Sequence, residues 1–131
     1  MKWVLLIFSG WMFFSVVRAD DGLQPRVHFV SNTDLLDPEA ETVLQTNVAW
    51  LKKNPQAVVI LEGHCDEWGE SSYNEELGDR RARAVKAYLI EQGIGPERSI
   101  MVVSFGEDKP LNPEHTMDAW RANRRVEFVV R

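Results

Sequence analysis

The sequence predicts an α/β domain in which a mixed β-sheet is covered by helices. Apolar runs of strand length alternate with longer stretches of helical periodicity, in the order β-α-β-α-β-(α)-β. Strands joined through helices return to the same sheet by crossovers, so the sheet should be at least partly parallel. The 131 residues are enough for one such domain and too few for two.

The start of the chain differs from the rest and has the layout of a secretory signal peptide. Lys2 supplies a positive charge, residues 3–17 are mostly apolar, and the following Arg18-Ala19 fits a signal-peptidase site. The apolar run is short for a membrane span, and an uncleaved anchor is the alternative interpretation. We expect a cleavable signal peptide, a short lead-in and one folded domain, at residues 1–19, 20–25 and 26–131.

Charge and cysteine content exclude some classes of partner and bond. The formal net charge is −5, and an acidic domain of this size repels phosphate backbones and anionic headgroups. Nucleic acid is therefore a poor candidate partner. Cys65 is the only cysteine, so no internal disulfide can form. We expect a half-buried thiol, with an intermolecular disulfide as the alternative in an oxidising compartment.

The first half of the domain should contain a strand, a helix and a second strand. Residues 26–31 alternate as a strand does. Asp37 can cap a helix whose first position is proline, and helical spacing continues until Asn54. Residues 57–61 form a continuous apolar run, typical of a strand covered on both faces.

The second half begins with a polar loop at residues 62–73. A second helix opens at Asn74 or Glu75, and Gly93 supplies the left-handed residue that ends it. A third strand, a possible short helix and a final strand follow at residues 99–105, 115–122 and 125–130.

Candidate binding residues lie where the second strand leaves the sheet, because ligands of α/β sheets gather at such strand ends. Asp66 leaves the sheet there, and Arg81 lies in the next helix. The two could form a structural ion pair. Alternatively they could hold a zwitterion, with Asp66 taking an ammonium and Arg81 a carboxylate in bidentate fashion. Spacing alone favours the ion pair.

Separated motifs in a specific order extend over nearly the whole domain. They are residues 62–69 (EGHCDEWG), the helical positions Tyr73, Asn74, Leu77 and 80–82, and the closing stretch 123–128 (NRRVEF). These motifs closely resemble the OmpA-like peptidoglycan-binding domain family, and within it the peptidoglycan-associated lipoprotein group. The cysteine that carries the lipid anchor in that group has no counterpart at the end of the signal region.

The resemblance implies an OmpA-like fold that binds the meso-diaminopimelate of the cell-wall stem peptide. Asp66 and Arg81 would hold its charged groups. The resemblance therefore favours a binding site over a structural ion pair. Four further residues are implied to line or border the pocket: Asn32, Leu77, Asn123 and Arg124. The expected function is non-covalent peptidoglycan binding that tethers or positions an envelope component, in the periplasm and next to the wall or the outer membrane.

Two other classes of function stay open. A docking protein would use Trp68 and Trp120 if they were exposed, although we expect both to pack against the rim. A peptidoglycan hydrolase would need paired carboxylates, such as Glu62 and Asp66. No nucleophile elbow, Cys-His pairing or zinc motif accompanies them, so we predict no enzymatic activity. Glu67 should belong to a solvated loop face.

A metal site is not predicted. His64 and Cys65 are adjacent and point apart in an extended chain, and no second cluster supplies the remaining ligands. We expect neither a metal nor another cofactor, and the resemblance implies a mainly structural role for His64.

Overall fold

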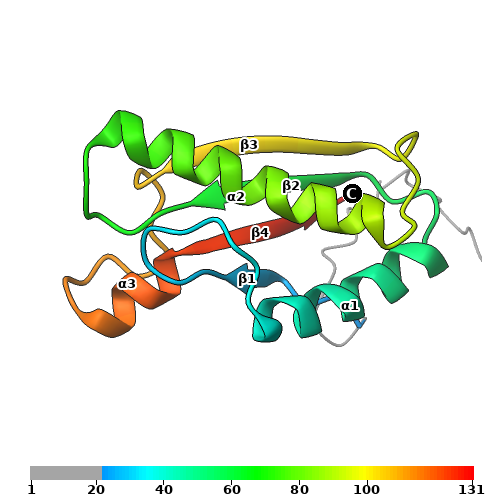
Figure 1. Ribbon diagram of the computed structural model, residues 1–131, viewed down its shortest axis with the longest axis horizontal. Coiled ribbons are helices and arrows are strands. Elements are labelled where there is room, and N and C mark those ends of the chain that lie inside the picture. Colours follow the sequence, from blue (N-terminus) through cyan, green and yellow to red (C-terminus); the bar gives the residue numbers. More distant parts are fainter. Residues whose placement is uncertain (1–21) are drawn as a thin grey trace, which may run out of the picture.

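The computed structural model describes residues 22–131, and its elements follow the predicted order. The predicted signal peptide lies outside the described residues. Within the described part, no helix has the length and apolar character needed to cross a membrane. The elements, labelled in Figure 1, are β1 (Arg26–His28), α1 (Pro38–Lys53), β2 (Val59–His64), α2 (Ser71–Glu91), β3 (Ile100–Gly106), α3 (Met117–Asn123) and β4 (Arg125–Val130).

The strands form one four-stranded sheet in the order β1-β4-β2-β3 (Figure 1). β2 and β3 run parallel, and β4 runs antiparallel to both β1 and β2. The prediction of a mixed, partly parallel sheet is confirmed. The last strand in the sequence, β4, occupies an interior position of the sheet and lies beside the first strand, β1.

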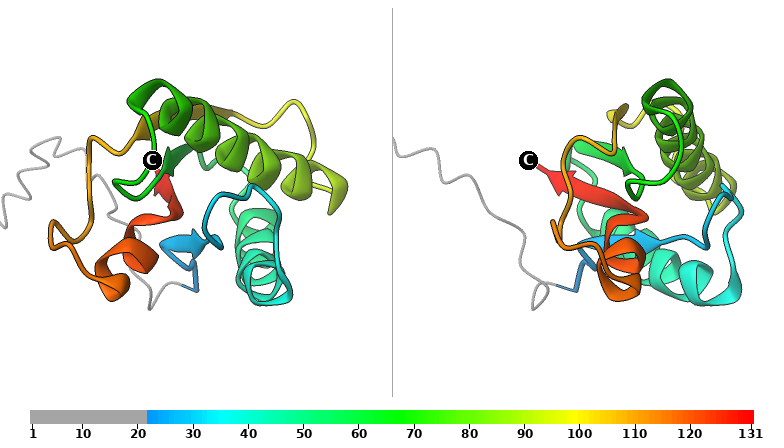
Figure 2. Two further views of the ribbon diagram at one scale, coloured as in Figure 1. Left: turned by 60° about the vertical axis from the view of Figure 1, so that its left-hand side comes forward. Right: turned by 90° about the vertical axis from the view of Figure 1, so that its left-hand side faces the viewer.

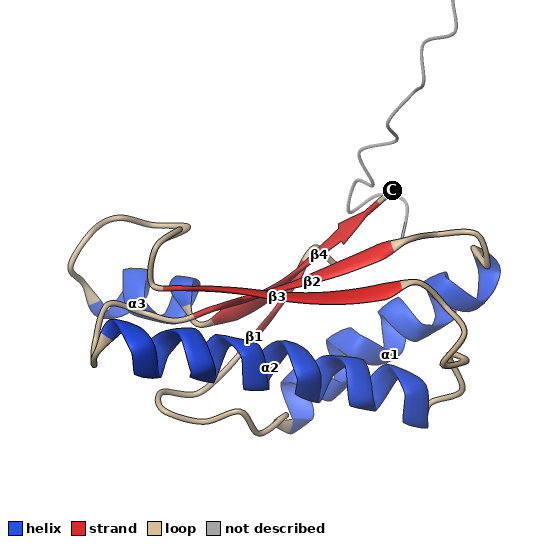
Figure 3. Ribbon diagram, turned by 90° about the horizontal axis from the view of Figure 1, so that it is seen from above, coloured by secondary structure: helices blue, strands red, loops and turns tan. Residues whose placement is uncertain are grey.

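Within residues 22–131, the helices cover one face of the sheet and leave the other open. Figures 2 and 3 show α1 and α2 on the same side, with α3 near one end. Along β2 the burial alternates: Val59 and Leu61 are buried, whereas Ile60 and Glu62 are partly exposed on the opposite, open face. The expectation that this strand is covered on both faces was therefore wrong, because its apolar run includes a residue of the open face.

The first and the second strand both differ in extent from the prediction. β2 continues to His64 instead of ending at Leu61, because Glu62 and Gly63 pair with both neighbouring strands and His64 still pairs with β3. β1 ends at His28 instead of residue 31. One further backbone bond joins Phe29 N to Arg124 O at 2.9 Å, after which Asn32 adopts a φ of 55° and the chain turns away.

The helix starts show how local sequence sets the loops. Asp37 caps α1 as predicted, since its carboxylate accepts a bond from Ala40 N at 2.8 Å. α2 begins at Ser71, earlier than the predicted Asn74. Gly69, with a φ of 96°, makes the turn that allows this early start, so the loop between β2 and α2 contains only a few residues.

A glycine pair lets α2 lie very close to β2. A Cβ atom at Gly63 would lie 1.8 Å from the carbonyl oxygen of Gly78, and one at Gly78 would lie 2.3 Å from the Ser104 hydroxyl. Below this contact the helices and the sheet share a core of fully buried side chains that includes Leu44, Leu51, Leu61, Val85, Leu89 and Val126. The close approach fixes the end of β2, and thus the residues that follow it.

We expect Gly63→Ala to lower the free energy of unfolding by about 1–3 kcal/mol, because the added methyl group collides with backbone and not with a flexible side chain. Urea denaturation of the purified domain measures this change. Gly95→Ala is the control, since its added methyl would meet only the mobile end of Glu97. Equal stability of the two variants would contradict the close packing of α2 on β2.

Candidate ligand-binding site

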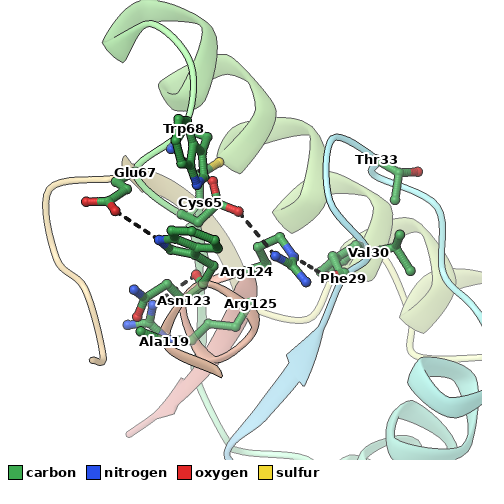
Figure 4. A network of polar contacts seen from close by, with 12 residues as sticks. Phe29, Val30, Thr33, Cys65, Glu67, Trp68, Ala119, Asn123, Arg124 and Arg125 are labelled. Carbon is green, nitrogen blue, oxygen red and sulfur yellow. Dashed lines mark hydrogen bonds and ion pairs between the residues drawn. The ribbon is translucent and has the colours of Figure 1, made fainter. Parts of the chain in front are cut away.

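An ion pair joins the loop after β2 to the start of β4. Asp66 is 7% exposed, and its Oδ2 atom lies 3.2 Å from a terminal nitrogen of Arg124. Its other oxygen accepts a hydrogen bond from the Trp68 backbone N–H at 3.1 Å. Arg124 also donates its Nε–H to the Phe29 carbonyl at 3.0 Å (Figure 4). Three segments distant in the sequence therefore meet at one carboxylate and one guanidinium.

Arg81 lies directly beside this pair but uses most of its donors on backbone carbonyls. Its guanidinium donates to Thr33 O at 2.8 Å, His64 O at 3.0 Å and Val30 O at 3.2 Å. A fourth bond, 3.6 Å long, reaches the Cys65 sulfur. A guanidinium has five N–H groups. These four bonds use four of them, which leaves one N–H of Arg81 without a partner within the described residues. The bidentate grip expected of Arg81 would require some of these bonds to open.

Burial and neighbouring charges act on Arg81 in opposite directions. The side chain is 1% exposed, and this burial lowers the pKa of its guanidinium, while the nearby Cys65 and Asp66 raise it. Its guanidinium carbon lies 5.3 Å from the centroid of the Phe29 ring. Asp66 lies near enough to Arg81 to act on its pKa, but the direct ionic partner of Asp66 is Arg124. A binding site shared by Asp66 and Arg81 stays a prediction.

The other predicted pocket residues occupy three different positions. Asn32 is exposed in the loop after β1, and its side-chain oxygen accepts a bond from the Tyr73 hydroxyl. Leu77 is 4% exposed on α2. The Asn123 side chain closes the loop before α3: its oxygen accepts from the Asn112 N–H at 2.9 Å, and its nitrogen donates to the Asn112 carbonyl at 2.8 Å. In this geometry Asn123 shapes a loop, whereas Asn32 is accessible to a ligand.

A cavity of the described part adjoins the ion pair, because Arg124 forms part of its lining. Its volume is about 550 Å³, and it lies between the end of β1, the start of α1 and α3. Apolar side chains such as Val27 and Val43 form its floor, and Asp37, Arg121 and Arg124 provide charges. Arg124 therefore contacts Asp66 and also lines a groove wide enough for a longer ligand.

Sequence reasoning missed a second polar cluster at the same end of the molecule. Glu67, expected to be solvated, accepts a hydrogen bond from Trp120 Nε1 at 2.9 Å and lies 2.6 Å from His115 Nδ1. The hydrogen bond with His115, and to a smaller extent that with Trp120, lowers the pKa of the Glu67 carboxyl. Trp68 also differs from expectation, because it is 63% exposed and does not pack against the rim. No short-range sequence signal links residue 67 to 115 or 120.

The described residues hold no grouping of three or more His, Cys, Asp or Glu side chains placed to bind a metal ion. Cys65 is buried more deeply than expected, at 3% exposure, and donates to Asn74 O at 3.1 Å. Burial raises the pKa of this thiol, so it stays protonated at neutral pH and is a poor nucleophile.

With this geometry established, comparison with known proteins identifies the family. The model of the OmpA family matches residues 28–124. The chain belongs to the OmpA family. The peptidoglycan-associated lipoprotein of Pseudomonas aeruginosa is 43% identical over 101 residues, which cover 77% of this chain and 59% of that protein. The one from Rhizobium meliloti is 33% identical over 105 residues, covering 80% and 59%.

Solved structures agree with this assignment to the OmpA family. The crystal structure of the peptidoglycan-associated lipoprotein from Burkholderia pseudomallei has a TM-score of 0.77 and 32% identity, covering 82% of this chain and 91% of that one. The C-terminal domain of Helicobacter pylori MotB has a TM-score of 0.75 at 21% identity, covering 84% and 85%, and shows similarity of fold. The chain spans about three-fifths of the length of the curated relatives it matches.

His64, part of the family's motif beside the site, is buried as a neutral ring. It is 2% exposed, stacks on Phe105 with ring centroids 5.5 Å apart, and neither ring nitrogen has a hydrogen-bond partner within the described residues. Burial lowers its pKa from 6.5 to about 4. Its contact of 3.9 Å with Glu62 is therefore not an ion pair at neutral pH.

We expect acid to destabilise this domain partly through His64. Because the folded-state pKa is lowered, the unfolded chain binds a proton first, and stability is lost as pH falls from 6.5 towards about 4. The loss from this one group is on the order of 2–3 kcal/mol. In His64→Phe the free energy of unfolding should fall less steeply over that range, as measured by denaturation at several pH values. An unchanged slope would contradict the neutral buried state.

Proposed function

We propose that this protein binds cell-wall peptidoglycan non-covalently, through the diaminopimelate residue of the stem peptide, and positions an envelope component against the wall. The observation that carries the proposal is the sheltered Asp66–Arg124 pair, with Arg81 beside it, in a domain of the OmpA family. Relatives named peptidoglycan-associated lipoproteins support the substrate class.

The chemistry of the pair suits a zwitterionic ligand. The free end of diaminopimelate carries an ammonium and a carboxylate on one carbon. Its ammonium would replace Arg124 as the partner of Asp66, and its carboxylate would bind Arg124 and the remaining N–H of Arg81. Each protein charge then exchanges one counter-charge for another, so no charge is left buried without a partner. Charge-assisted bonds of this kind are short and strong.

Arg81 has a double role in this proposal. It adds positive potential beside the ligand carboxylate, and it holds the carbonyls of Val30, Thr33 and His64 around the site. Removing it would leave several buried acceptors without donors, which damages the fold as well as binding. Substitutions at Asp66 and Arg124 therefore test ligand binding more cleanly.

The proposed activity is binding without bond cleavage, in the periplasm and next to the wall. The adjacent His64 and Cys65 do not form a nucleophile–base pair, since the Cys65 thiol is buried and protonated and the His64 ring has no hydrogen-bond partner within the described residues. Incubation of purified sacculi with the protein separates the two classes. Co-sedimentation without soluble muropeptides is expected, and their release would show a hydrolase.

We expect Asp66→Asn to weaken binding to diaminopimelate-containing sacculi by roughly ten- to a hundredfold, because the ligand ammonium loses its ionic acceptor. Quantitative sedimentation of the protein with sacculi measures the change. Glu91→Gln, which removes an exposed acid at the far end of α2, is the charge-matched control and should bind normally.

A second substrate tests the diaminopimelate assignment itself. Sacculi that carry lysine at the same peptide position lack the side-chain carboxylate and should bind more weakly to the unmodified protein. Arg124→Gln should reduce binding to diaminopimelate walls and leave the weak binding to lysine walls nearly unchanged. Equal sedimentation of the Asp66→Asn variant and the unmodified protein would refute the proposed site.

A further inference from the structure

An exposed tryptophan stands on a firmly held backbone beside Asp66. The Trp68 N–H donates to Asp66 Oδ1 at 3.1 Å, and its carbonyl accepts from Asn74 Nδ2 at 2.9 Å. The side chain is nevertheless 63% exposed. A large apolar ring exposed to water on a fixed backbone, two residues from Asp66, is the kind of surface feature that contacts a ligand. Its rigid attachment lowers the ordering entropy lost on binding.

A second indole extends this surface and is itself held in place. The rings of Trp68 and Trp120, here called the tryptophan pair, meet edge to face with centroids 5.3 Å apart and an interplanar angle of 76°. Trp120 is half-buried on α3, and its Nε1–H donates to Glu67 at 2.9 Å. Glu67 is held in turn by His115. The pair is therefore preorganised between α3 and the loop after β2.

The surroundings of the tryptophan pair indicate the chemistry of its ligand. A cavity of about 280 Å³ beside it is lined by Glu67, Glu107 and Glu114, so anionic lipids and phosphate backbones would be repelled. A saccharide ring is uncharged and has an apolar face of C–H groups that can stack on an indole. Its hydroxyl groups can donate hydrogen bonds to carboxylates. These properties match an aromatic surface bordered by acceptors.

We propose that the tryptophan pair binds a hexosamine ring of the peptidoglycan glycan strand. This inference rests on the proposed function, because the saccharide is joined to the same peptide that Asp66 would hold. Trp68 and Asp66 are two residues apart and hydrogen-bonded, so the peptide and the glycan would occupy adjacent positions. The domain would then recognise both components of the wall polymer instead of the peptide alone.

Two soluble ligands separate the saccharide contribution from that of the peptide. One is the tripeptide L-Ala-γ-D-Glu-meso-diaminopimelate, and the other is the same tripeptide carrying the disaccharide of the wall. By calorimetry, the unmodified protein should bind the disaccharide form about five- to tenfold more tightly, as expected for an aromatic contact. Trp68→Ala should abolish this difference and keep the affinity for the free tripeptide.

Two further variants serve as controls. Trp68→Phe keeps an aromatic face and should restore part of the preference for the disaccharide form. Met101→Ala removes a similarly exposed apolar side chain, 59% exposed on the open face of the sheet, and should change neither affinity. Saturation of the indole protons should transfer to the sugar C–H protons in NMR of the complex.

The outcomes distinguish this inference from the proposed function. Equal affinity of the unmodified protein for both ligands overturns the saccharide contact and leaves peptide binding intact. An equal loss of affinity for both ligands in Trp68→Ala also overturns it, because Trp68 would then act on the peptide site. Failure to bind either ligand overturns the proposed function, and the inference with it.

Discussion

The buried guanidinium of Arg81 is the interaction on which the site depends. It binds the carbonyls of Val30 and Thr33, after β1, and that of His64, at the end of β2. A single rigid cation with several donors binds all three carbonyls together. Because His64 lies two residues before Asp66, the same cation determines where the Asp66 carboxylate stands relative to the loop that carries Asn32.

Contacts of the loop after β2 with the C-terminal part of the domain extend this arrangement. Asp66 joins Arg124, and Glu67, next in sequence, joins Trp120 and His115. Two consecutive acids therefore connect one short loop to α3 and to the chain before it. Such preorganisation matters for binding a charged ligand, since groups that are already oriented lose little entropy when the ligand arrives.

Local rules predicted the elements well and their partners poorly. The Asp37 cap, the strand at residues 125–130 and the mixed sheet followed from periodicity and capping, which act over a few residues. The extension of β2 to His64 was missed, because strand pairing, with β3 throughout and with β4 as far as Gly63, outweighs the polar character of Glu62 and His64. Family resemblance selected Asp66, Arg81 and Arg124. It could not reveal that Arg124 is the direct partner of Asp66, 58 residues away.

The interior position of β4 also shapes how the domain can form. β1 joins the sheet only through β4, in a register that pairs Arg26 with Glu127 across 101 residues of chain. A nascent polypeptide lacking residues 125–130 has no place to dock its first strand and cannot close its core. Such a topology has high contact order, which slows folding and favours an unfolded chain until synthesis of this last strand is complete.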